Sequence, residues 1–264
     1  MEFFDSHSHY NDEKFDEDRE EIINKTYEDG ITKFVCAGYD IESSKKSIEI
    51  CNKYPFIYSI CGVSPNDVPE SLEEVESYVK QIEEIIKEDK NNKVLAVGEI
   101  GLDYHWNKEN KEIQKQMFIK EIELANKYNL PIVIHTREAV EDTITILKEN
   151  NVINKGVFHC CPLNRQLVHD ALKLGFYISF AGPITFKNSK NAEEIVKMVP
   201  LDKVLIETDS PYLAPEPKRG TRNDSRNVKL VAQKVADFKN IKIEEVAKAS
   251  YENAYKIFTK IMKK

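Results

Sequence analysis

The sequence predicts a (β/α)8 barrel of the TIM-barrel architecture, an α/β fold, in a single domain over residues 1–264. Short segments rich in Val, Ile and Phe alternate with amphipathic segments, which is the pattern of parallel strands joined by crossover helices. No linker interrupts the alternation, and no glycine-rich dinucleotide loop follows the first strand. A closed barrel therefore fits better than an open doubly wound sheet.

The strands are expected at eight short apolar runs. The first run contains Phe3 and Phe4 and leads directly into two histidines, whereas the fourth ends on the acidic Glu99 and the last is followed directly by the acidic Asp209. We expect strands at residues 2–6, 33–37, 56–62, 94–99, 132–135, 156–159, 176–180 and 204–208.

The helices are expected between these runs, where apolar residues recur with helical spacing. Leu72, Val75, Val79, Ile82 and Ile86 show the period on a stretch otherwise rich in Glu and Lys, which predicts a helix with a charged outer face. We expect the helices at residues 18–28, 42–52, 72–86, 113–127, 140–148, 166–174, 192–198 and 226–238, with a last one at 243–261.

Composition is that of an ordinary globular protein, with 41% hydrophobic and 31% charged residues. No segment approaches the roughly 18 to 20 apolar residues of a membrane span, and the acidic start lacks the basic region of a signal peptide. We therefore expect a cytoplasmic protein with no membrane association and no obligate protein partner. Five cysteines without zinc-like spacing predict reduced thiols rather than a disulfide framework.

The net charge of −7 argues against a surface that coats nucleic acid, although it does not exclude a nuclease. One local basic cluster has enough charge for a few phosphate contacts, and a solvated loop is the alternative interpretation. The cluster consists of Lys218, Arg219, Arg222, Arg226 and Lys229.

Four of the six histidines, His7, His9, His135 and His159, stand at the carboxyl ends of predicted strands. In a barrel these ends open onto one face, where active sites of this fold lie. His7 and His9 are two residues apart, so both imidazoles project from the same face of an extended strand. Taken alone, such a pair is often coincidental or exposed to solvent.

Two acids complete the pattern, because Glu99 and Asp209 each end a buried apolar run, where an unpaired carboxylate is expensive. A salt bridge or a helix N-cap is the alternative to metal binding. Imidazole and carboxylate ligands suit zinc, manganese or similar ions, and carboxylate-rich sites admit magnesium, so the set does not select one metal. Six candidate ligands are too many for one open catalytic ion, which favours two divalent ions bridged by a carboxylate.

Five strings, in order between residues 5 and 223, resemble the TatD family of metal-dependent hydrolases and deoxyribonucleases. They are Asp5-Ser6-His7-Ser8-His9, Gly98-Glu99-Ile100-Gly101-Leu102-Asp103-Tyr104, His135-Thr136-Arg137-Glu138-Ala139, Gly156-Val157-Phe158-His159-Cys160 and Glu207-Thr208-Asp209-Ser210-Pro211-Tyr212-Leu213-Ala214-Pro215.

The resemblance implies a barrel of the amidohydrolase superfamily that hydrolyses phosphodiester bonds in DNA, often from the 3′ end. It implies one metal at His7, His9 and Asp209, a second at His135 and His159, and Glu99 between them. Asp209 would orient the attacking water and take its proton. Glu207 and Asp103 would hold the ligands in place, with a simple loop or strand hydrogen bond as the alternative.

Substrate contacts are expected from Arg137, Arg219 and Arg222, because guanidinium groups bind phosphate oxygens in pairs. Surface placement is the alternative. Tyr104, Trp106 and Tyr212 are candidates for stacking on a base, although aromatic residues more often serve packing.

The sequence departs from the family pattern in two places. The family commonly has Gly-x-His-Pro after the third strand, whereas this chain has Ser64 in the histidine position. Serine keeps a hydrogen bond there but supplies no cationic contact. After His159 the usual Cys-Phe-Ser-Gly is replaced by Cys160-Cys161-Pro162-Leu163, which alters the pocket wall. These cysteines are more readily interpreted as small apolar residues than as ligands or redox groups.

Two further functions stay open at this point. One is a deaminase or an amide or ester hydrolase of the amidohydrolase type that acts on a small molecule, usually with one metal. The other is a catalytically silent barrel that binds a ligand or partner.

Overall fold

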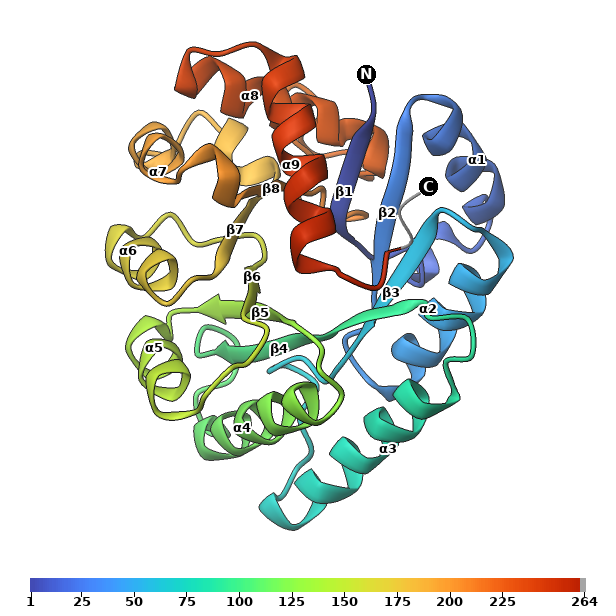
Figure 1. The fold of residues 1–264 in the computed structure, drawn as a ribbon, viewed down its shortest axis with the longest axis vertical. Helices are drawn as coiled ribbons and strands as arrows, with labels where there is room; N and C mark the ends of the chain where they lie inside the picture. The colour runs from blue at the N-terminus through green and yellow to red at the C-terminus, as the bar shows by residue number, and fades with distance from the viewer. Residues whose placement is uncertain (262–264) are drawn as a thin grey trace.

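In the computed structural model, which describes residues 1–261, eight parallel strands pair in chain order and form one sheet (Figure 1). The sheet closes between its first and last strands, where Ser8 and Ser210 form a parallel bridge and the N–H of Asp209 donates to the carbonyl of His7 at 2.9 Å. The strands are β1 (Phe3–Ser8), β2 (Ile31–Ala37), β3 (Ile57–Cys61), β4 (Val94–Asp103), β5 (Ile132–Arg137), β6 (Gly156–Phe158), β7 (Tyr177–Phe180) and β8 (Val204–Ile206).

Helices surround the strands, as the amphipathic segments predict (Figure 1). In α3 the apolar residues Val75, Ile82, Ile85 and Ile86 are buried, while the charged face is solvated. The α-helices within residues 1–261 are α1 (Arg19–Glu28), α2 (Ile41–Lys53), α3 (Val75–Glu88), α4 (Lys111–Lys127), α5 (Val140–Glu149), α6 (Arg165–Lys173), α7 (Ala192–Met198), α8 (Val228–Lys239) and α9 (Ile243–Ile257). None of these helices combines the length and apolar character needed to cross a membrane.

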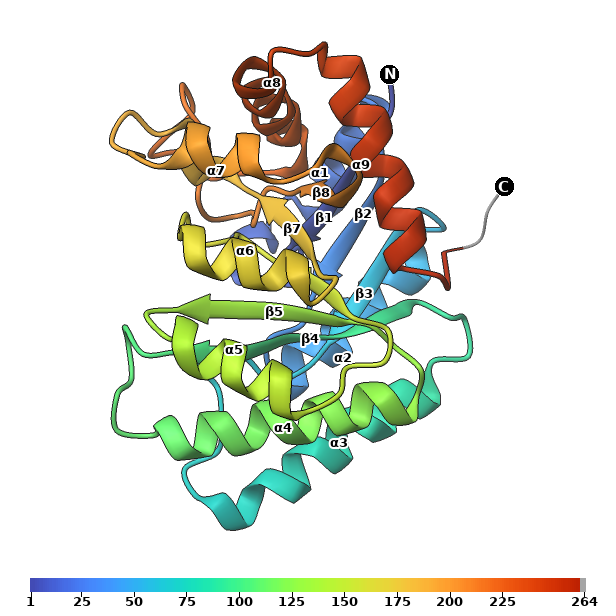
Figure 2. The ribbon, with the colours of Figure 1, turned by 60° about the vertical axis from the view of Figure 1, so that its left-hand side comes forward.

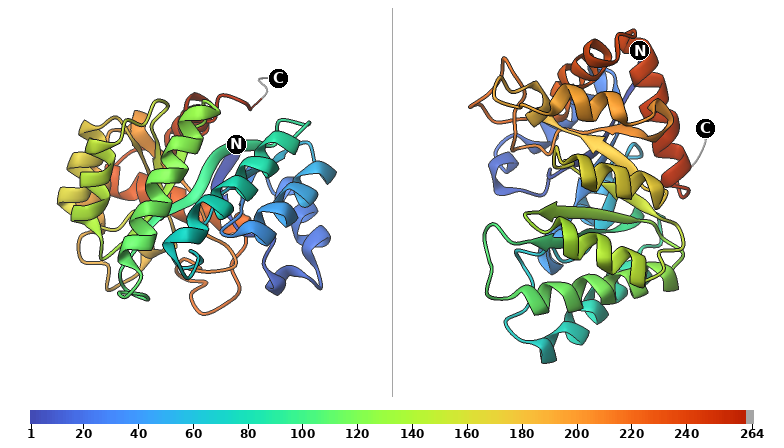
Figure 3. Two further views of the ribbon diagram at one scale, coloured as in Figure 1. Left: turned by 90° about the horizontal axis from the view of Figure 1, so that it is seen from below. Right: turned by 90° about the vertical axis from the view of Figure 1, so that its left-hand side faces the viewer.

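The last helix closes one end of the barrel. Alternate strand residues pack inward or outward: Phe3 and Ile132 join the cluster under the outer helices, whereas Phe4 and Val133 join an inner cluster that also contains residues of α9. The ring of Phe258, which follows α9, stacks on Phe4 with centroids 6.3 Å apart. Helix α9 and the N-terminus thus lie at the amino ends of the strands, and the loops after the strands project at the opposite mouth (Figures 2 and 3).

The predicted barrel and all of its strands and helices are confirmed, with differences at the ends. Strand β4 runs to Asp103 instead of stopping at residue 99, because Gly101 allows the chain to continue alongside β5. Gly101 has φ +135°, and a Cβ there would lie 2.1 Å from the carbonyl oxygen of His135. Gly101 therefore lies within β4, two residues beyond the predicted end of the strand.

Most of the other elements also begin or end one to three residues from the predicted positions. Strand β1 reaches Ser8, whereas β6 and β8 stop at Phe158 and Ile206, one and two residues earlier than predicted. Helix α9 ends at Ile257 rather than at residue 261, because the chain turns to place Phe258 under the barrel. The last three residues of the predicted domain, 262–264, lie outside the described part of the chain.

Candidate metal centre at the strand ends

The structure brings all six predicted ligands together at the carboxyl mouth of the barrel. His7 and Glu99 project from strands β1 and β4, and His135 projects from β5. The other three follow β1, β6 and β8 directly or within three residues; they are His9, His159 and Asp209.

The first group of donors joins β1 to the loop after β8. Nε2 of His9 lies 3.2 Å from Nε2 of His7 and 3.1 Å from Oδ1 of Asp209. Asp209 takes a left-handed backbone conformation, with φ 57°, directly where β1 and β8 meet. This turn places its carboxylate beside the two imidazoles.

The second group joins β4, β5 and the loop after β6. Oε1 of Glu99 lies 3.0 Å from Nδ1 of His135 and 3.2 Å from Nε2 of His159. The other oxygen of the same carboxylate, Oε2, lies 3.4 Å from Nε2 of His7. Glu99 therefore presents one oxygen to each group of imidazoles.

These residues fit a divalent cation. Two sets of donor atoms are compact enough to hold an ion, because the atoms within each set all lie within 4.8 Å of one another. One set comes from His7, Glu99 and His159, and the other from His7, His9 and Asp209. Nε2 of His7 lies 3.2 Å from Nε2 of His9 and 3.4 Å from Oε2 of Glu99, so imidazole and carboxylate lone pairs converge on one place, as expected of a site for a cation. Nitrogen and carboxylate donors suit zinc, manganese and similar ions.

The charges within the cluster keep the carboxylates ionised. Burial alone would raise the pKa of Glu99, but the charge of His159 and hydrogen bonds from the surrounding imidazoles hold that pKa well below its usual range. Burial also raises the pKa of Asp209, but the hydrogen bond from His9 and the charges of His9, His159 and His7 together hold that pKa below its ordinary value. Burial lowers the pKa of His7, which favours the neutral imidazole that binds metals.

Groups outside the cluster fix the orientation of the imidazoles. Nε2 of His135 forms a hydrogen bond of 2.9 Å with Oδ2 of Asp103. Nδ1 of His159 lies 3.3 Å from Oε1 of Glu207, an ion-pair distance without the geometry of a hydrogen bond. Nδ1 of His9 lies 3.1 Å from the carbonyl oxygen of Ala37. Such contacts from the far nitrogen set the tautomer and ring angle of a metal-binding histidine. Asp103 and Glu207 thus lie where a supporting role requires them.

The predicted substrate residues are less uniform in their positions. Arg137 is exposed on β5, two residues beyond His135. Arg219 lies over the ring of Phe186, with its guanidinium carbon 4.3 Å from the centroid. Arg222 donates to both carboxylate oxygens of Asp18.

Two other predicted substrate contacts are engaged within the protein. The hydroxyl of Ser64 donates to Asp67 at 2.6 Å, and that of buried Tyr104 donates to Asp142 at 2.6 Å. Neither hydroxyl is among the groups at the ligand cluster, so their roles in substrate binding stay predictions.

The predicted basic cluster is spread over several ion pairs. In addition to the pair between Arg222 and Asp18, Arg226 pairs with Asp224 at 2.8 Å and Lys229 with Asp29 at 2.9 Å. These pairs agree with the alternative interpretation of a solvated, internally neutralised loop.

Aromatic rings flank the first donor group. The ring of Tyr212 lies 6.2 Å from that of His9, and Tyr39, just after β2, lies at 5.7 Å. Tyr39 is absent from the sequence prediction, because an aromatic residue without a ligating atom gives no metal signal. Its position directly after a strand is the clue that could have found it. All five cysteines are free, as predicted, and Cys161 is buried.

Comparison with known proteins agrees with the fold and identifies the family of the chain. A family model described as TatD related DNase matches residues 4–259. The chain is 41% identical over 256 residues to the uncharacterized metal-dependent hydrolase YabD of Bacillus subtilis (strain 168), covering 97% of this chain and 98% of that protein. It is 39% identical over 199 residues to the uncharacterized metal-dependent hydrolase YcfH of Escherichia coli (strain K12), covering 75% and 72%.

A solved structure shows the same fold. The crystal structure of YJJV, a TatD homolog from Escherichia coli K12, superposes with a TM-score of 0.89 at 25% identity and covers 97% of this chain and 98% of that one. The chain is thus a metal-dependent hydrolase with a barrel fold, and its buried donor groups could hold a metal ion. Within that class, the chain belongs to the TatD-related DNase family.

Proposed function

We propose that this protein hydrolyses phosphodiester bonds, in DNA or in smaller phosphodiesters, with two divalent ions. The observation that supports two ions is the position of Glu99, whose carboxylate oxygens face different imidazole groups at 3.0 Å and 3.4 Å. The family match supports a nuclease, whereas the names of the close relatives specify metal dependence and hydrolysis without a substrate.

The ligand roles follow from the two donor groups. His7, His9 and Asp209 would hold one ion, and His135 and His159 would hold the second. Divalent ions, when bound, lower the pKa of water and neutralise charge that develops on an attacked phosphorus group.

The remaining chemistry falls to the side chains. Ionised Asp209, at the edge of the cluster, would orient the attacking water and accept its proton. Asp103 and Glu207 would keep the imidazole rings at fixed angles. Arg137, exposed two residues beyond His135, would contact a substrate phosphate.

The test is hydrolysis by the purified protein after loading with zinc, manganese, magnesium or cobalt. The substrates are a single-stranded oligonucleotide and bis(4-nitrophenyl) phosphate, and elemental analysis counts the ions per chain. We expect hydrolysis of both substrates and close to two ions. One firmly held ion and no phosphodiesterase activity would instead favour a deaminase or an amide or ester hydrolase, and inactivity with every ion would favour a binding barrel.

A further inference from the structure

Trp106 is the most exposed large apolar side chain in residues 1–261, with 70% of its surface accessible. It lies in the loop between β4 and α4, which projects beyond the end of β5 at the carboxyl mouth (Figure 2). Exposure of an indole to water is unfavourable, because contact between its large apolar surface and another surface would lower the free energy. Its position at this mouth therefore calls for an explanation.

The loop is fixed to the candidate metal centre through one carboxylate. Oδ1 of Asp103 accepts the backbone N–H groups of His105 at 2.9 Å and Trp106 at 3.3 Å. Oδ2 of the same residue lies 2.9 Å from Nε2 of His135. The backbone of the indole is thus tied to the group that orients a proposed ligand, and the His105 ring meets the indole edge-on at 4.8 Å.

A cation lies beside the indole. The guanidinium carbon of Arg137 is 5.3 Å from the centroid of the Trp106 ring. Arg137 follows His135 by two residues in β5 and pairs with Asp103 in the sheet register, so its side chain leaves the same face of the strand as His135. An exposed ring and an exposed guanidinium therefore occur together, about 6 to 7 Å along the strand from a ligand.

We propose that Trp106 and Arg137 form a nucleobase site. The indole stacks on an unpaired base, and Arg137 binds the adjoining phosphate, which positions the neighbouring phosphodiester over the metal centre. The ligand class is an unpaired nucleotide, because a base within a duplex is already stacked on both faces. This inference rests on the proposed phosphodiesterase function and specifies how that site holds its substrate.

The fluorescence of the protein gives a direct test, because Trp106 is the single tryptophan of the chain. The metal-loaded protein is titrated with a hydrolysis-resistant phosphorothioate tetranucleotide and with an abasic tetranucleotide of the same backbone. We expect saturable quenching by the first and little by the second. Equal quenching by both would overturn the proposal, because the backbone alone would then account for binding.

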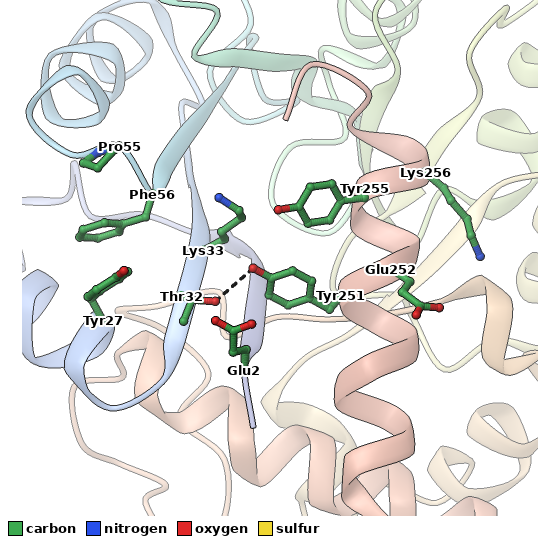
Figure 4. A pocket seen from close by; sticks show the side chains of 10 residues that line it. All are labelled: Glu2, Tyr27, Thr32, Lys33, Pro55, Phe56, Tyr251, Glu252, Tyr255 and Lys256. Carbon is green, nitrogen blue, oxygen red and sulfur yellow. Dashed lines mark hydrogen bonds between the residues drawn. The ribbon is translucent and has the colours of Figure 1, made fainter. Parts of the chain in front are cut away.

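Kinetics provide the second test. We expect Trp106→Ala to raise KM for a base-containing oligonucleotide by roughly 5- to 100-fold and to leave KM for the abasic one unchanged, with Trp106→Phe close to the wild type. The matched control is Tyr27→Ala, which removes a 40% exposed ring from a cavity of about 600 Å³ at the opposite end of the barrel (Figure 4). Tyr27 stacks on Phe56 there, and its loss should leave both KM values unchanged.

The two proposals fail in different ways. If the wild type hydrolyses oligonucleotides but Trp106→Ala changes KM equally for base-containing and abasic substrates, the nucleobase site is wrong and the proposed function stands. If no ion supports hydrolysis but only the base-containing probe quenches Trp106, the proposed function is wrong, and base binding by Trp106 stands without its role in positioning a phosphodiester for hydrolysis. If neither hydrolysis nor quenching occurs, both are wrong.

Discussion

Asp103 and His135 form a hydrogen-bonded pair across neighbouring strands, with Oδ2 of the carboxylate 2.9 Å from Nε2 of the imidazole. Nδ1 of the same ring faces Glu99. The contact between these two strands therefore determines which nitrogen of His135 points into the cluster. Substitution of Asp103 tests directly whether this contact holds His135 in place.

We expect Asp103→Asn to lower metal affinity or turnover by about 10- to 100-fold, because the amide does not accept and polarise the His135 N–H as a carboxylate does. Isothermal titration with zinc and steady-state kinetics measure the two effects. The matched control is Asp170→Asn, since Asp170 pairs with His169 at 3.3 Å on the surface of α6. Similar losses in both variants would contradict the role given to Asp103.

Glu99→Gln and Asp209→Asn should each lower turnover by at least about 100-fold, because each removes an anionic donor from the cluster. The inner cluster of the barrel lies away from these side chains, so circular dichroism should show an unchanged fold. Either residue would leave the proposed catalytic set if its variant kept activity comparable to the wild type.

Chelation should lower the melting temperature of the wild type, because an ion that binds only the folded state stabilises it by mass action. Ions held between Glu99 and the four imidazoles would also offset the burial of their polar atoms. Differential scanning calorimetry with and without a chelator measures the shift, and Glu99→Gln should show a smaller one. Equal melting temperatures with and without the chelator would argue against a bound ion.

Arg222→Ala should raise KM for an oligonucleotide more than for bis(4-nitrophenyl) phosphate, if its guanidinium contacts phosphate. The effect should be smaller than that of Arg137→Ala, because Asp18 already neutralises much of the charge of Arg222. Kinetics at a fixed low salt concentration compare the variants, since phosphate contacts weaken with salt. Equal changes in KM for the two substrates would remove Arg222 from the substrate site.

Glu121→Gln should stabilise the protein at neutral pH. Glu121 is fully buried in α4, where Oε1 accepts the N–H of Val63 at 2.7 Å and Oε2 has no hydrogen-bond partner. Burial raises the pKa of this carboxyl well above its ordinary value of 4.5. The stability contributed by the neutral carboxyl is therefore present below pH 4.5 and is lost as the pH rises toward the raised pKa of the folded state.

Glutamine stays neutral throughout, so the advantage of Glu121→Gln should be near zero at pH 4.5 and reach about 1 to 3 kcal/mol at pH 8. Urea unfolding at the two pH values measures it. Glu123→Gln serves as the control, because Glu123 is exposed on the same helix and pairs with Lys120. If the gain in unfolding free energy from Glu121→Gln does not increase with pH, ionisation of Glu121 does not destabilise the wild type and the prediction is wrong.

The convergence of the six proposed ligands could be predicted from sequence because each of them stands at or just after the end of an apolar run. His7, His135 and Asp209 follow short apolar runs, and a parallel barrel brings the ends of such runs to one mouth whatever their separation in the chain. Position along a strand was therefore enough to select residues, although it says nothing of which nitrogen or oxygen atom faces the centre.

Contacts between loops could not be predicted in this way. Arg222 and Asp18 are 204 residues apart, and the pair depends on how two irregular segments settle beside each other. Gly101 shows a second limit, since a glycine that permits close strand approach has the same sequence appearance as one that ends a strand. Such features arise from packing in three dimensions rather than from local pattern.

The stacking of Phe258 on Phe4 has a consequence for the order of assembly. During synthesis, the inner surface of β1 emerges from the ribosome long before the helix that shields it from water. A nascent chain that lacks α9 would present Phe4 to solvent or to chaperones. The amino end of the barrel would therefore be covered only after all eight strands have been synthesised.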